Sequence, residues 1–237
     1  MSHEVSENKH RRIEGGLLIV MLLLFVAVYN RRWIRNELNP RPAVTTLNAG
    51  DRRAAHSWNR ARADSAIRIV RNGDLVLRSG SDAISALFKR VNTRDKNYSH
   101  AGIVFIENGY PFVYNCIGSA ADPDALLRRD SLCAYISPAE NLGYAVYRYR
   151  LRPAQAEKLY TVALRYFKER RRFDPHFDLT TDSALYCTEF VYKAMLETTG
   201  DKKYLPLTEA SGFSFVSVDN LFVRKDMALV CRIGYIQ

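Results

Sequence analysis

Two side chains in this 237-residue sequence, Cys187 and His100, are suited to nucleophilic catalysis. The cysteine is followed at helical spacing by Phe190, Val191 and Ala194, which predicts that it faces inward from the first turn of a helix. Unpaired N–H groups and the helix dipole at that position favour a thiolate with a lowered pKa, and the same N–H groups can stabilise an oxyanion. A cysteine on an apolar helix face is also often only a small buried hydrophobic residue. The cysteine alone leaves both interpretations open.

A predicted hairpin supplies a base and an orienting amide. A two-residue turn at Asn108–Gly109 sets a register in which the numbers of opposite residues sum to 217. Gly102 then lies opposite Asn115, and His100 lies diagonal to Asn115 on the same face, about 7–8 Å away between backbones. Gly102 has no side chain to block their approach. An imidazole held at one nitrogen by an amide is what a thiol-activating base requires; a surface histidine beside an ordinary asparagine is the alternative interpretation.

The composition is that of a globular protein with an excess of positive charge. Hydrophobic residues make up 47% and charged residues 25%, which excludes wholesale disorder and a fibrous architecture. The 35 Lys and Arg against 25 Asp and Glu give a net charge of +10, which suits an anionic membrane surface, an acidic polymer or nucleic acid. The sequence has no nucleic-acid-binding signature, phosphate loop or dinucleotide fingerprint, and its four cysteines lack zinc-site spacing. We therefore expect no nucleic acid, metal or organic cofactor.

An apolar run near the N-terminus predicts a membrane anchor. Every residue from Leu17 to Val28 is apolar, and we assign residues 1–14 to a tail, 15–30 to a transmembrane helix and 31–65 to a basic linker. A cleaved signal peptide and a buried core helix are the alternatives, although no small-residue cleavage site follows the run. Basic residues flank both ends of the run equally, so the charge does not decide its orientation.

Helix and strand patterns alternate irregularly after residue 66. The sequence predicts strands at 74–77, 101–106, 112–117, 144–149 and 228–236, and helices at 81–91, from Pro153 to about 171, and at 187–199. Because helices do not follow strands regularly, the pattern favours an α+β fold with a small antiparallel sheet over a doubly wound one.

Four segments resemble a known family. Gly73–Gly80 (GDLVLRSG), Tyr98–Phe105 (YSHAGIVF), Phe112–Gly118 (FVYNCIG) and Tyr186–Ala194 (YCTEFVYKA) look like the permuted papain-like cysteine hydrolases of the YiiX/YebB type. That family belongs to the NlpC superfamily and is similar to lecithin retinol acyltransferase. The resemblance covers about residues 70–200, and it implies a circularly permuted papain-like fold over residues 66–237.

The resemblance also implies roles for three residues. Cys187 would be the nucleophile, His100 the base, and Asn115 the third polar residue, a position commonly held by a carboxylate in close relatives. An amide can orient the imidazole, but it stabilises an imidazolium less strongly than a carboxylate does.

Three further residues are candidates for supporting roles. Glu189 either supports the site or is simply a first-turn acid favoured by the helix dipole. Tyr186 either lines the pocket or packs in the core, and Gly102 leaves room between the histidine and the asparagine. Cys133 and Cys231 could form a disulfide if the domain is extracytoplasmic.

The resulting prediction is a membrane-anchored cysteine hydrolase that cleaves a peptide or N-acyl amide, with cell-wall peptides among the candidate substrates. Membrane lipid would contact the N-terminal helix and the basic linker, and we expect the catalytic domain to be extracytoplasmic. Three alternatives remain: a lipid acyl hydrolase or acyltransferase, an inactive binding module with the same fold, and a membrane-tethered interaction protein.

Overall fold

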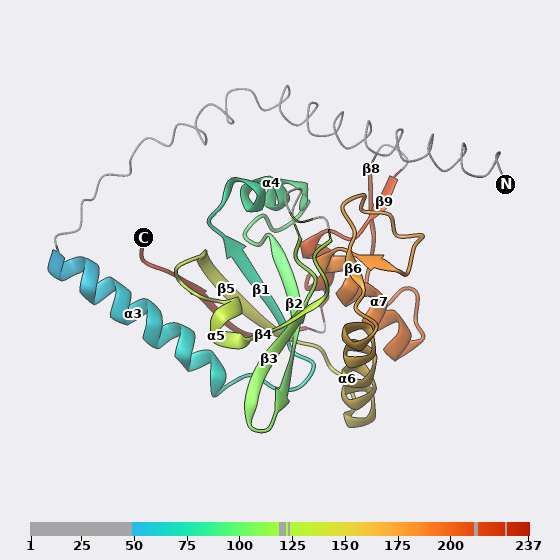
Figure 1. Ribbon diagram of the computed structural model, residues 1–237, viewed down its shortest axis with the longest axis horizontal. Coiled ribbons are helices and arrows are strands. Elements are labelled where there is room, and N and C mark those ends of the chain that lie inside the picture. The colour runs from blue at the N-terminus through green and yellow to red at the C-terminus, as the bar shows by residue number, and fades with distance from the viewer. Residues whose placement is uncertain (1–48, 119–121, 123, 211–212, 226) are drawn as a thin grey trace. The chain divides into compact units, whose positions relative to one another are not determined.

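A six-stranded antiparallel sheet lies at the centre of the computed structural model (Figure 1), which describes residues 49–118, 122, 124–210, 213–225 and 227–237. The strand order is β10–β5–β1–β2–β3–β4, and every neighbouring pair is antiparallel. The strands of this sheet are β1 (Leu75–Gly80), β2 (His100–Glu107), β3 (Tyr110–Asn115), β4 (Arg128–Ser131), β5 (Asn141–Arg148) and β10 (Ala228–Gly234). The helices are α3 (Ala49–Ile67), α4 (Ala83–Val91), α5 (Leu132–Tyr135), α6 (Pro153–Lys168), α7 (Cys187–Thr199) and the 3₁₀ helix η1 (Val218–Leu221). Two small ladders pair β6 (Arg172–Phe173) with β7 (Ala184–Leu185), and β8 (Thr208–Ala210) with β9 (Phe213–Phe215).

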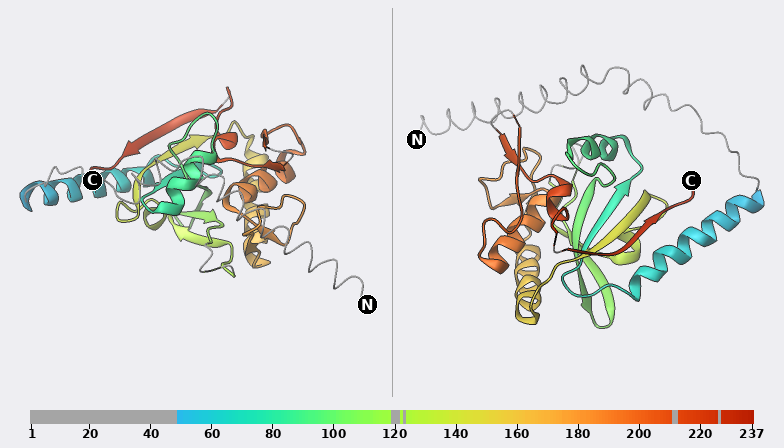
Figure 2. Two further views of the ribbon diagram at one scale, coloured as in Figure 1. Left: turned by 90° about the horizontal axis from the view of Figure 1, so that it is seen from above. Right: turned by 180° about the vertical axis from the view of Figure 1, so that it is seen from behind.

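Both faces of the sheet are covered, because alternate residues of a strand point to opposite faces. Leu75 and Ile103 belong to a hydrophobic cluster that includes α6 and α7. Val76 and Val104, one position along each strand, belong to a second cluster that includes α3 and α5. The two groups of helices lie on different sides of the sheet (Figure 2). The result is the mixed α and β fold that the sequence predicted.

The β2–β3 hairpin has the predicted register. Asn108 and Gly109 have φ angles of 51° and 82°, the two left-handed residues of a type I′ turn. Glu107 pairs with Tyr110, and the pairing continues to Ile103. The predicted register, in which the numbers of opposite residues sum to 217, is therefore confirmed. His100 and Gly102 lie on the face of the sheet that also carries Val104 and the hydrophobic cluster of α3 and α5.

Helices α6 and α7 begin at the predicted residues. Pro153 opens α6, where a missing N–H does no harm. Cys187 opens α7, and Gly200 ends it with a φ of 72°, the left-handed conformation that glycine adopts without strain.

The prediction of a linker through residue 65 is wrong for its last part. Residues 49–67 form α3, and Asn59, Ala63 and Ala66 of that helix are buried. The Asn59 amide bonds the backbone of Ile236 in both directions, at 2.8 and 2.9 Å. Only a few positions of α3 are buried against the rest of the domain, and one of them is polar. The sequence of this helix therefore has no periodic pattern of hydrophobic residues.

The predicted membrane helix at 15–30 and the linker before residue 49 lie outside the described residues. Within the described ranges, we find no helix that is both long and apolar enough to cross a bilayer.

Candidate functional site

The Cys187 thiol lies at the open end of the β2–β3 ladder, where pairing stops at Ile103. Both backbone groups of Val104 bond the segment leading into β1, so the Ala101 N–H, three positions earlier, points away from β1. This N–H lowers the pKa of the Cys187 thiol, as do the N–H of Thr188 and that of Cys187 itself. Backbone N–H groups that act on the sulfur in this way can stabilise a thiolate or an oxyanion.

Burial nevertheless raises the pKa of the Cys187 thiol above its ordinary value. The three N–H donors and the Arg78 cation act in the opposite direction, but the loss of hydration outweighs them. The sequence predicted a lowered pKa from the helix dipole, which is the smaller effect here. The side chain keeps some exposure to solvent and is present as the neutral thiol at neutral pH.

His100 begins β2 and is held by the residue before it. Its Nδ1 lies 2.8 Å from the Ser99 Oγ, which also accepts the Gly80 N–H at 3.0 Å. The ring is 8% exposed, and burial lowers the pKa of His100 to about 3; the nearby Arg78 cation acts in the same direction and Asp82 opposes it. The imidazole is therefore neutral at physiological pH.

Asn115 ends β3 on the same face as Gly102. A Cβ at Gly102 would lie 3.2 Å from the Cβ of Asn115, so these two residues are in the contact that the register predicts. The Asn115 Nδ2 donates to Asp130 Oδ2 at 3.0 Å, and its buried Oδ1 has no partner among the described residues. Across the same ranges, no hydrogen bond joins His100 to Cys187 or to Asn115. The structure thus places the three predicted residues around one end of the hairpin without linking them directly.

Sequence reasoning missed three charged or polar side chains around these residues. Arg78 pairs with His100 in the β1–β2 ladder, so both side chains lie on one face. Its guanidinium lies 5.1 Å from the ring centre of Tyr135, whose carbonyl it approaches at 3.5 Å. Asp82 caps α4 by accepting the Ser85 N–H at 2.8 Å, and its charge favours the imidazolium form of His100. Helix α4 lies between β1 and β2 in the sequence, so no tight turn sets a register that would have located Arg78.

A single segment, residues 216–219, holds both catalytic candidates in place. Val216 donates its N–H to the Tyr186 hydroxyl at 2.9 Å and accepts the Thr188 hydroxyl at 2.5 Å, which anchors the start of α7. Asp219 is fully buried and accepts the backbone N–H groups of residues 93 and 94 at 2.9 and 2.6 Å. Those residues precede His100, so one segment positions the loop before the histidine and the helix of the cysteine.

Glu189 and Tyr186 both stabilise the start of α7. The Glu189 Oε2 accepts the Tyr186 N–H at 3.1 Å, and its Oε1 lies 3.0 Å from the Lys193 ammonium. Burial raises the pKa of Glu189 to about 7, against the effect of Lys193. These contacts match the helix-terminal role considered for Glu189.

The acidic loop at residues 174–178, before α7, is stabilised by hydrogen bonds from its own backbone N–H groups. Asp174 accepts the N–H groups of His176 and Asp178 at 2.8 and 2.6 Å.

All four cysteines are free, so the considered Cys133–Cys231 disulfide is not formed. In the described part of the chain, no group of three or more His, Cys, Asp or Glu side chains is arranged to hold a metal ion.

The comparisons with known proteins identify the fold. No family model and no curated protein matches the chain. A solved structure does match: the crystal structure of "metalloprotein yiiX from Escherichia coli O157:H7, DUF1105" aligns with a TM-score of 0.58 and 20% identity. The alignment covers 70% of this chain and 99% of that one. The chain therefore has a YiiX-like fold.

Proposed function

We propose that this protein is a cysteine hydrolase that transfers an acyl group from an amide or ester to Cys187 and then to water. The observation that carries the proposal is the position of Cys187 as the first residue of α7, where the backbone N–H of Ala101, the residue after His100, acts on its thiol. Cys187 begins α7 and His100 begins β2. A nucleophile close to a base is the arrangement that thiol catalysis requires.

Each step uses groups of this chain. His100 Nε2 accepts the thiol proton while the sulfur attacks the carbonyl carbon, and the N–H groups near Sγ bind the resulting oxyanion. The carbon–nitrogen or carbon–oxygen bond then breaks, and the leaving group takes the proton from the imidazolium. Water attacks the thioester with His100 again acting as the base, which releases the acid and regenerates the thiol.

The resting protonation states set the order of events. Thiol and imidazole are both neutral in this structure. Proton transfer therefore accompanies attack, rather than preceding it as in a preformed thiolate–imidazolium pair.

The proposed substrate is a peptide or N-acyl amide close to a membrane. Residues 1–65 contain 11 Lys and Arg against 6 Asp and Glu, a net +5 beside the predicted anchor, which supports attraction to anionic lipid. A lipid ester processed by the same chemistry is the alternative substrate.

The second candidate function is an inactive binding module. It is favoured by the low pKa of the His100 imidazole and by the lack of a hydrogen bond between His100 and Cys187 among the described residues. A binding module would keep the pocket residues but would form no acyl-enzyme.

Trapping of the acyl-enzyme separates the two functions. The full-length chain is mixed with 4-nitrophenyl acetate, and peptide mass spectrometry follows acetylation of each cysteine. We expect acetylation of Cys187, slowed about 10²-fold or more in His100→Ala, whereas Cys231→Ala leaves the Cys187 adduct unchanged. Acetylation of Cys187 no faster than of Cys231 would contradict the hydrolase.

A further inference from the structure

Arg78 Nε, Tyr135 OH and Asn115 Oδ1 are among the buried polar atoms that have no partner in the described residues. Buried polar groups in folded proteins are nearly always paired, so each unpaired atom requires an explanation. These three belong to three different strands or helices, yet their side chains lie on the same face of the sheet. A shared ligand accounts for all three.

The charge of the group points to an anionic ligand. The Arg78 side chain is 14% exposed, and its Nη1 is engaged by the Tyr135 carbonyl at 3.5 Å and by Glu140 at 3.6 Å. Glu140 is 71% exposed, so this ion pair is weak and easily replaced. The remaining edge of the guanidinium, which includes Nε, has the geometry that binds a carboxylate through two parallel hydrogen bonds.

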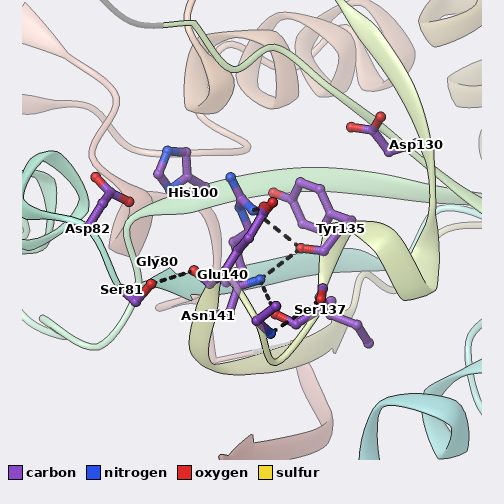
Figure 3. Close-up of polar contacts among 12 residues, drawn as sticks. Gly80, Ser81, Asp82, His100, Asp130, Tyr135, Ser137, Glu140 and Asn141 are labelled. Carbon is purple, nitrogen blue, oxygen red and sulfur yellow. Dashed lines mark hydrogen bonds and ion pairs between the residues drawn. The ribbon is translucent and has the colours of Figure 1, made fainter. Parts of the chain in front are cut away.

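The position of Arg78 in the sheet places the Nε edge of its guanidinium close to the reacting groups, His100 and Cys187. Arg78 is the ladder partner of His100, and its cation acts on both the Cys187 thiol and the Tyr135 hydroxyl. The Asn141 Nδ2 also donates to the Tyr135 carbonyl, at 3.2 Å (Figure 3). A group bound to Arg78 therefore lies beside the acyl carbon that Cys187 would attack.

We infer that Arg78 and Tyr135 bind a carboxylate carried by the acyl part of the substrate, so that the enzyme selects anionic acyl donors. The inference deepens the proposed function and rests on it for the acyl-transfer step only. A carboxylate fits better than a phosphate, because the site offers one cation and one hydroxyl, with Asp130 and Glu140 as nearby negative charges. The Asn115 Oδ1 is left to accept an N–H of the substrate.

A pair of matched esters tests the inference. The 4-nitrophenyl esters of glutarate and pentanoate differ in the terminal carboxylate, and their rates are corrected for hydrolysis without protein. We expect the full-length chain to prefer the glutarate ester in kcat/KM, and Arg78→Gln to lower that preference by about tenfold or more. Tyr135→Phe should lower it by a smaller factor, and Arg68→Gln, a change at an exposed arginine, should leave it unchanged.

A binding measurement separates this inference from the hydrolase proposal. Calorimetry with the Cys187→Ala chain measures glutarate affinity without any chemistry, and Arg78→Lys serves if Arg78→Gln does not fold. Arg78-dependent binding of glutarate without ester turnover would support the carboxylate site and contradict the hydrolase. Turnover of both esters at equal rates, or tighter binding of inorganic phosphate than of glutarate, would overturn the carboxylate site.

Discussion

Ser99 and His100 are neighbours in the chain whose side chains bond each other, with the Ser99 Oγ 2.8 Å from the His100 Nδ1. The serine hydroxyl has one proton, and it can also donate to the Arg78 carbonyl at 3.3 Å. When it does so, Nδ1 carries the ring proton and Nε2 is free to accept the proton of a thiol. In this arrangement Ser99 holds His100 in the tautomer that acts as a base.

Replacing Ser99 with alanine should lower kcat for acyl transfer by about tenfold to a hundredfold, as expected when the partner that orients a functional imidazole is removed. KM should change little, because Ser99 orients His100 and does not touch the substrate. Ser99→Thr keeps the hydroxyl and should restore the rate. Steady-state kinetics of the three proteins make the test, and equal loss in Ser99→Ala and Ser99→Thr would show that packing, not the hydroxyl, is responsible.

The reactivity of Cys187 towards iodoacetamide should rise with pH through an inflection above that of a cysteine in an unstructured peptide. Burial raises the pKa of the thiol, and Arg78 partly offsets this effect. In Arg78→Gln the inflection should therefore move to still higher pH, whereas Arg68→Gln should leave it in place. Peptide mass spectrometry reports Cys187 separately from the other cysteines. A plateau below neutral pH would instead reveal a preformed thiolate.

Gly102→Ala should destabilise the protein by about 1–3 kcal/mol, the usual cost of overpacking. The new Cβ would lie 2.5 Å from Val113 Cγ1 and 2.9 Å from the Tyr114 carbonyl oxygen, so β2 and β3 would have to separate. Gly234→Ala is the matched control, because no atom lies within 4 Å of a Cβ there. Urea denaturation measures the stability of both variants. Similar midpoints would show that β3 can move away from the new Cβ without loss of stability.

Glu189 should make the stability of the protein depend on pH between about 4.5 and 7. Its folded pKa of about 7 exceeds the ordinary value of 4.5, so the folded state holds this proton more tightly than the unfolded chain. The contribution is complete below about pH 4.5 and decreases as pH rises through 7, by ~3 kcal/mol in total. Glu189→Gln removes the titration, and its stability relative to wild type should increase over this interval. Urea denaturation at several pH values measures the difference, and a constant difference would mean that Lys193 keeps the carboxylate charged throughout.

Much of the fold could be predicted because its signals are local. The Asn108–Gly109 turn determines the β2–β3 register, and with it the contact between Gly102 and Asn115. Proline and glycine mark the first residue of α6 and the end of α7 for equally local reasons. The YiiX-like fold inferred from four short segments agrees with the structural comparison.

The parts that could not be predicted depend on distant contacts. Helix α3 buries an asparagine and two alanines, and β4 has the sequence RRDS, so neither has a hydrophobic pattern. Tyr135 comes from a four-residue helix, and Asp219 finds its N–H partners more than 120 residues away. The net pKa of Cys187 also depends on burial, which spacing along a helix does not reveal.

The segment at residues 216–219 has a consequence for the synthesis of the protein. Translation produces His100 and Cys187 before it produces Val216 and Asp219, which hold the two elements carrying them. The edge strand β10 is made later still, at about 5–20 residues per second. A nascent chain therefore carries the thiol and the imidazole without the contacts that position them, and the reactive centre is assembled only after Asp219 has been made.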